Sequence, residues 1–300
     1  MDAPLDLPAR FDRRSLKRED IDTVVALANV CERNDVGFTM WEREDLDSDF
    51  RIDGVDPARD TVGVFRADEL VGWGFLPDDR GAWVDVHPGV RRLGVGTWLR
   101  RWTERRATER GAQRVGQTIN DRAAEAVELL VAAGYTPRRT SWILSMEHAE
   151  RPADPVPPDG ITLRAYGPGD EDEALAMFET AFGEWPDRFP STLGTWRAMT
   201  IEREGFTPKD LILALDCDQI VGGAFLIDSD EIWVDKLAVR RDHRHRGIAR
   251  ALLQVAFQRG FDRGYPATAL STDSNTGALT LYERVGMHMR ESYTHLAIDL

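Results

Sequence analysis

The fold is decided by one stretch, Val239-Arg-Arg-Asp-His-Arg-His-Arg-Gly-Ile-Ala-Arg-Ala-Leu-Leu253. An apolar run from Ile232 leads into it, and a helical pattern with one apolar face follows Gly247. A strand, a basic turn and a helix in this order aim free backbone N–H groups and the positive end of a helix dipole at one point. Such a point binds phosphate, and Gly247 lets the backbone approach because it has no Cβ.

The chain after this turn adds a second strand and a second helix. Ala267–Asp273 has a strand pattern, Asn275 follows it, and a helical pattern then carries Tyr282 four residues before Gly286. The order predicted from the pattern is therefore strand, arginine-containing turn, helix, strand, asparagine, helix with tyrosine, and glycine.

Within this order, Arg244-x-x-Gly247-x-Ala249 matches the signature R/Q-x-x-G-x-G/A. The signature by itself is short, and a surface turn with solvated arginines is the alternative interpretation. Taken together, residues 231–287 resemble the cofactor-binding half of the GNAT acetyltransferase superfamily.

The chain contains an internal repeat. Residues 70–75 return as residues 220–225, and Gly94 and Gly134 correspond to Gly247 and Gly286, each about 150 residues later. A spacing that drifts by only a few residues indicates duplication of one fold.

A proline-rich, polar segment at 151–160 separates the copies and is expected to be a linker. The predicted domains are residues 1–150 and 161–300. Each resembles one complete GNAT domain, which implies an α/β (α+β) class with two tandem GNAT folds. Each fold would be a mixed, mostly antiparallel sheet with helices on both faces.

Periodicity predicts the elements of both copies. In the first copy we expect strands at 9–15, 61–66, 70–76, 82–86 and 114–119, and helices at 17–30, 95–110 and 123–133. In the second we expect strands at 161–166, 211–215, 220–227, 232–239 and 267–273, and helices at 170–182, 192–202 and after Gly247. Residues 135–147 and 287–300 are each expected to form a closing hairpin.

Composition narrows the function classes. The net charge is −14 and the sequence pI about 4.9, which disfavours nucleic acid as a partner. The two cysteines lie in different halves, no metal-ligand spacing occurs, and no apolar run reaches the roughly 18–20 residues of a membrane span. We therefore expect a soluble, cytoplasmic protein without a metal, while its oligomeric state is not indicated.

The GNAT resemblance implies acetyl-CoA as the cofactor. In that family two central strands separate and hold the pantetheine arm, which here implicates the backbone near Leu237 and Val239. The resemblance assigns the pyrophosphate to the turn in the second copy, namely Arg244, His245, Arg246, Gly247, Ile248 and Ala249. The first copy has an intact signature of its own at Arg91, Arg92, Gly94, Val95 and Gly96.

By the same resemblance, Tyr282 matches the general acid that protonates the departing thiolate. A phenol with an ordinary pKa near 10 suits that role, although a tyrosine packed in the core is the alternative. Asn275 matches an asparagine near the pantetheine arm, with capping of the next helix as its alternative.

The general base is left open between two carboxylates. Glu231 and Asp235 are four residues apart, so on a regular strand both would lie on the same face as Trp233. Either could take a proton through water or bind a cationic amine. Direct attack by the amine in a ternary complex is the expected route.

The first copy lacks the matching side chains. Leu130 stands where the second copy has Tyr282, and Ala123 stands where it has Asn275, although Asn120 is close to the latter position. The first copy is therefore expected to be a catalytically degenerate domain that can still hold coenzyme A.

The main interpretation is an acetyl-CoA-dependent N-acetyltransferase acting on a primary amine of a small molecule. One alternative is suggested by the chain's likeness to the mycothiol synthases, a group of tandem GNAT enzymes that acetylate the amine of a cysteinyl glycoside. Trp233, however, stands where that group is expected to carry a carboxylate. A non-catalytic acyl-CoA-binding or scaffold protein is the alternative from another class.

Overall fold

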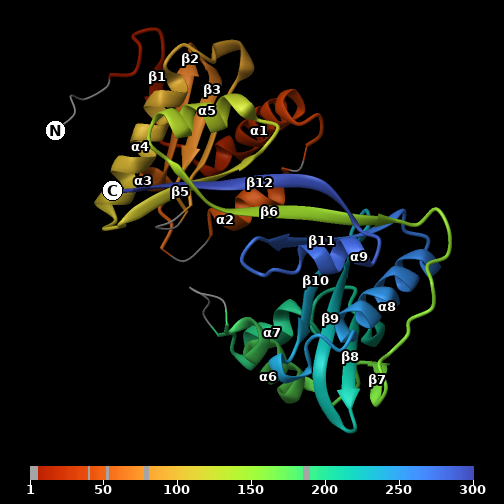
Figure 1. Cartoon of the computed structure of the whole chain (residues 1–300). Coiled ribbons are helices and arrows are strands. Elements are labelled where there is room, and N and C mark those ends of the chain that lie inside the picture. The colour runs from red at the N-terminus through yellow and green to blue at the C-terminus, as the bar shows by residue number, and fades with distance from the viewer. Residues whose placement is uncertain (1–5, 40, 52–53, 78–80, 185–189) are drawn as a thin grey trace. The chain divides into compact units, whose positions relative to one another are not determined.

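The computed structural model describes residues 6–39, 41–51, 54–77, 81–184 and 190–300. They form two compact units (Figure 1). The first unit takes the described residues of Met1–Ser141 together with Ser292–Leu300, and the second takes those of Trp142–Glu291.

The first unit is built on a four-stranded sheet, with a strand of a second sheet beside it. Its first four strands are neighbours in sequence order and antiparallel: β1 (Asp12–Arg14), β2 (Thr61–Arg66), β3 (Glu69–Phe75) and β4 (Trp83–Val86). Next comes β5 (Arg114–Asn120), joined to the segment before β4 by the parallel bridge Gly81↔Gly116. Strands β4 and β5 therefore separate beyond this bridge.

Side chains of β3 build a core on each face of this sheet, and a register shift against β2 between Val64 and Phe65 interrupts their alternation. Leu70 and Trp73 pack with α1 (Ile21–Asp35) and α2 (Arg43–Asp49). Val71 faces the other way and packs against α4 (Val95–Glu109). The short helix α3 (Pro57–Asp60) leads into β2, and α5 (Ala124–Ala132) follows β5.

The second unit repeats this plan. Its strands β7 (Ile161–Ala165), β8 (Leu211–Asp216), β9 (Gln219–Asp228) and β10 (Ile232–Val239) are antiparallel neighbours, and β11 (Ala267–Asp273) is parallel to β10. One core lies against α6 (Glu171–Phe182) and α7 (Leu193–Met199). The other lies against α8 (Ile248–Asp262) and α9 (Leu279–Arg284).

The two expected closing hairpins are wrong. Residues 136–147 form one strand, β6 (Thr136–Glu147), and residues 288–299 form one strand, β12 (His288–Asp299). The late half of β12 pairs with β5, from Tyr293↔Asn120 to Asp299↔Arg114. Neither strand turns back on itself, because pairing with strands distant in sequence replaces pairing across a local turn.

The predicted class, mixed sheets with helices on both faces, is confirmed, and most predicted elements appear within a few residues of their expected ends. Helices α2 and α3 were not predicted, because both are too short to show a clear period. No helix in the described ranges combines the length and apolar character needed to cross a bilayer.

Candidate active site

The centre of the second unit is an opening between β10 and β11. The two strands are in register only at Ile232↔Thr268 and Trp233↔Ala269. Beyond that point β10 stays paired with β9 as far as Val239↔Gly222. The later part of β10, which includes Leu237, has therefore left β11, and backbone groups along the opening can bind a ligand.

The turn that follows β10 has the geometry of an anion site. Gly247 is the N-cap of α8 with φ +90°, and His245 also lies in the left-handed region with φ +61°. Left-handed residues in such a turn make successive N–H groups converge, and those in the first turn of α8 have no acceptor within the helix. Both residues are exposed, so the turn is open to solvent.

The side chain of the signature arginine holds the turn in place. Arg244 Nε donates to the Val239 carbonyl at 3.1 Å, and its Nη1 donates to Glu184 Oε2 at 2.8 Å. The guanidinium also keeps the pKa of Glu184 below its usual range. Arg244 thus ties the turn to the end of β10 and to the segment after α6. Because its side chain is already engaged, the backbone N–H groups remain the main hydrogen-bond donors for an anion.

A second arginine of the turn also has a carboxylate partner. Arg246 Nη1 donates to Asp216 Oδ2 at 3.1 Å, and this bond lowers the pKa of Asp216. Ile248 is buried and Ala249 half-buried, because both belong to the apolar face of α8. Their contribution to an anion site would come from backbone N–H groups alone.

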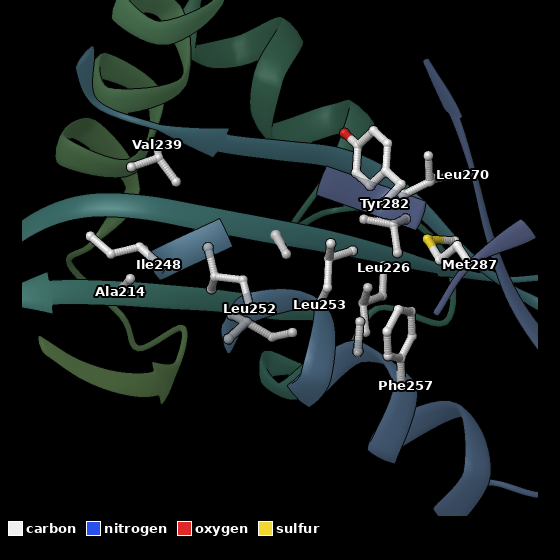
Figure 2. Packing of buried hydrophobic residues seen from close by; sticks show 14 of the residues in the cluster. Ala214, Leu226, Val239, Ile248, Leu252, Leu253, Phe257, Leu270, Tyr282 and Met287 are labelled. Atoms are coloured by element: carbon white, nitrogen blue, oxygen red, sulfur yellow. The ribbon is translucent and has the colours of Figure 1, made fainter. Parts of the chain in front are cut away.

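Tyr282 lies at the edge of the core beside the opening. Its residue is 7% exposed, and the side chain of Thr272 on β11, beyond the part of β11 that pairs with β10, interacts with its hydroxyl. In Figure 2 the hydroxyl points away from Met287 and Phe257. Burial raises the pKa of Tyr282 to about 12, so the phenol keeps its proton at neutral pH.

Asn275 does not cap the following helix. The helix α9 begins at Leu279 after the N-cap Ala278, which has no side-chain cap. Asn275 instead lies in an exposed turn, where its N–H donates to Asp273 Oδ1 at 2.9 Å. The capping interpretation is therefore wrong.

The two carboxylates proposed as bases do not share a strand face. Glu231 precedes β10, and its carboxylate binds both Nη atoms of Arg290 at 2.7 and 2.8 Å. Asp235 sits at a bulge, where the register with β9 shifts between Val234 and Lys236. Because a bulge breaks the alternation of side chains along a strand, Glu231 and Asp235 are not placed on one face as they would be on a regular strand.

The bulge also brings a residue into the site that the sequence did not indicate. Lys236 forms an ion pair with Asp235, its neighbour in sequence, and its Nζ lies 5.3 Å from the ring centroid of Phe225. Thr272 was missed too, although it lies two residues from the buried Leu270 on β11 and so faces the same core.

The first unit has a matching turn. Gly94 has φ +92° and Arg92 has φ +61°, while Arg91 Nε donates to the Val86 carbonyl at 3.1 Å and its Nη1 to Asp35 at 2.6 Å. The backbone of the turn is thus the same in both copies.

The first unit has no phenol at the position of Tyr282. Leu130 is 2% exposed and packs in the core there. Asn120, the closest match to Asn275, ends β5 and accepts from the N–H of Arg122 at 3.0 Å. A tyrosine at this position is therefore specific to the second unit.

Comparison with known proteins agrees with this geometry. The family model "Acetyltransferase (GNAT) family" matches residues 23–135 and 173–287, one match in each copy. A mycothiol acetyltransferase of Thermomonospora curvata is 34% identical over 234 residues, which cover 75% of this chain and 74% of that protein.

Solved structures show the same two-copy layout. A GCN5-related N-acetyltransferase from Sphaerobacter thermophilus is 31% identical, with a TM-score of 0.83, and the match covers 98% of this chain and 97% of that one. A tandem GNAT protein from the clavulanic acid biosynthesis pathway shares the fold at 16% identity, with a TM-score of 0.69 and coverage of 96% and 98%.

Proposed function

The chain belongs to the acetyltransferase (GNAT) family and is an enzyme that transfers an acetyl group to an amine; from that premise we propose that its second copy is the catalytic one. The acetyl donor would be acetyl-CoA and the acceptor a primary amine of a small molecule. The observation that carries this proposal is Tyr282, a phenol that only the second unit has at this position, buried beside Thr272 of β11.

The residues present fit coenzyme A. The exposed turn at His245 and Gly247 offers N–H groups to a pyrophosphate, and the free edge of β10 near Leu237 offers backbone groups to a pantetheine arm. Bound there, acetyl-CoA would supply a thioester carbonyl for the amine to attack. The backbone near Leu237 would orient that carbonyl, and Asn275 would stand close to the arm.

Tyr282 would act as the general acid. Because its pKa is about 12, it stays protonated at neutral pH and can donate to sulfur as the C–S bond breaks. The neighbouring Thr272 side chain is itself held by Thr276, whose Oγ1 lies 2.8 Å from its own.

Asp235 is the better candidate for receiving the proton of the amine. Glu231 is already bound on both oxygens by Arg290, and protonation would weaken that ion pair. Asp235 is exposed and lies where β10 leaves β11, so an ammonium group can reach it. An incoming ammonium group would take the place of its ion-pair partner Lys236.

The acceptor is proposed at the level of a class. Relatives named mycothiol acetyltransferases make the amine of a cysteinyl glycoside the first specific alternative. Trp233 lies between the two carboxylates in sequence and is half-buried. Its indole would offer an acceptor a flat apolar surface in place of a charge.

The test is release of free thiol from acetyl-CoA in the presence of a panel of amines that includes a cysteinyl glycoside. We expect turnover with at least one amine, and loss of that turnover in Tyr282→Phe. Tight acetyl-CoA binding without turnover across the panel would favour the scaffold alternative. Turnover that survives in Tyr282→Phe would refute the proposed active centre.

A further inference from the structure

The helix after the second central strand differs between the copies. Both helices end two residues before a glycine, α5 at Ala132 and α9 at Arg284. Yet α5 has 9 residues and α9 has 6, so α5 begins one turn earlier. The corresponding segment of the second copy is the loop that contains Thr276 and Gly277.

The additional turn of α5 places a carboxylate at the phosphate-binding turn of the first copy. Glu125 Oε1 accepts from Nη2 and Nε of Arg92 at 3.0 and 3.3 Å, and Glu125 Oε2 lies 3.6 Å from Arg91 Nη1. A second acid, Glu128, lies 3.8 Å from Arg92 Nη2. The cationic side chains of this turn therefore already face an anion.

The second copy has no acid at the corresponding position, although Arg244 and Arg246 of its turn pair with Glu184 and Asp216 from other segments. Counted back from the glycine that follows each helix, Glu125 corresponds to Gly277. Gly277 has φ +64°, and a Cβ built on it would meet no atom within 4 Å. The space beside the second turn is therefore open at Gly277, whereas the matching space beside the first turn holds Glu125.

An apolar side chain adds to the obstruction. A Cβ built on Gly96, in the first turn of α4, would lie 3.2 Å from Cδ2 of Leu129 on α5. The space that the glycine leaves is thus used for packing between α4 and α5.

We propose that the additional turn of α5 closes the phosphate-binding turn of the first copy to coenzyme A, with Glu125 as the blocking group. A pyrophosphate would have to approach Arg91 and Arg92 against this carboxylate, and like charges at such a distance repel. Glu125 and Arg92 are 49% and 73% exposed, so water weakens the repulsion and we expect an effect of about tenfold or more on affinity. The inference rests on the proposed function, because it assumes that the open second turn binds acetyl-CoA.

The test is calorimetric titration of the whole chain with acetyl-CoA. The wild type should bind one molecule per chain, and Glu125→Gln should bind a second, because it keeps the shape of the side chain and removes the charge. A triple variant, Ala123→Asn, Ala124→Thr and Glu125→Gly, copies the second copy's loop and should also gain a site. The matched control is Glu283→Gln, which removes the acid of α9 and should still bind one molecule of acetyl-CoA per chain.

Each outcome decides the matter. Two sites in the wild type would overturn the inference, and so would a count of one in both Glu125 variants when they melt as the wild type does. A gained site must also disappear when Gly94→Glu is added, since otherwise it lies elsewhere and the inference fails. No binding by the wild type would instead refute the proposed cofactor site of the second copy.

Discussion

Replacing Tyr282 by Phe isolates the hydroxyl that the proposed chemistry needs. The ring and its packing in the core remain, so the fold and the affinity for acetyl-CoA should be retained. If the hydroxyl protonates the departing sulfur, kcat should fall by roughly 10²–10⁴-fold, the range for a positioned acid. The loss should appear in kcat, because the hydroxyl is not needed to bind the acceptor.

The accompanying change in stability should be small. The change removes an interaction of the hydroxyl with Thr272, but Thr272 keeps its bond to Thr276 at 2.8 Å, so no partner is left unsatisfied. The cost should be about 0.5–1 kcal/mol. For a chain of this size that corresponds to a fall in melting temperature of roughly 1–4 °C.

The assay is kcat and melting temperature measured on the same preparation, with the amine found in the panel. Tyr265→Phe is the matched control, because it removes another phenol hydroxyl, one beside Asp228 in the same unit. It should melt slightly lower and keep its kcat within about twofold. A Tyr282→Phe variant that melts lower but turns over normally would show that Tyr282 is only a core residue.

Three further predictions use other sites. Gly247→Glu should abolish acetyl-CoA binding and turnover, because it places a negative side chain in the open turn. Gly94→Glu should keep at least half of the turnover. Equal losses of turnover in the two variants would mean that the wrong copy has been chosen as the catalytic one. Asp235→Asn should lower kcat/KM by roughly 10–100-fold if its carboxylate receives the proton. Glu231→Gln should mainly lower the melting temperature. The reverse pattern would make Glu231, and not Asp235, the general base. Burial raises the pKa of Asp85 from 3.8 to about 6, so its ionised form should cost the fold about 2–3 kcal/mol above pH 7, a cost that fades as the pH falls toward 4. Asp85→Asn should therefore stabilise the protein at pH 8 and have little effect at pH 4, and a difference independent of pH in thermal melts would contradict the assigned pKa.

The layout around the second turn could be predicted from the sequence because its signals are local. The apolar run of β10, the glycine that starts α8 and the position of Tyr282 are all set by near neighbours in the chain. The repeat then carried the same layout to the first copy, where Gly94 has almost the same φ as Gly247. Both matches to the family model lie within the two predicted copies.

What the sequence did not predict depends on the partners of each segment. Whether residues 136–147 fold back or run on depends on strands far away in the chain, and no local turn signal reports this. The bulge at Asp235 is likewise a property of pairing with β9. The partner of Arg244 could not be inferred either, because Glu184 is sixty residues away in the chain.

The continuous strand β12 has a consequence for the order in which the protein can assemble. The first unit includes Ser292–Leu300, which follow the whole of the second unit in the chain. During synthesis the part of β12 that pairs with β5 is therefore made only after residues 142–291. Domains usually fold in the order in which they emerge, but here the part made first must wait with an incomplete sheet. An unpaired strand is a template for pairing with other chains, so until β12 is made the growing polypeptide exposes an edge of β5 that β12 covers in the finished protein.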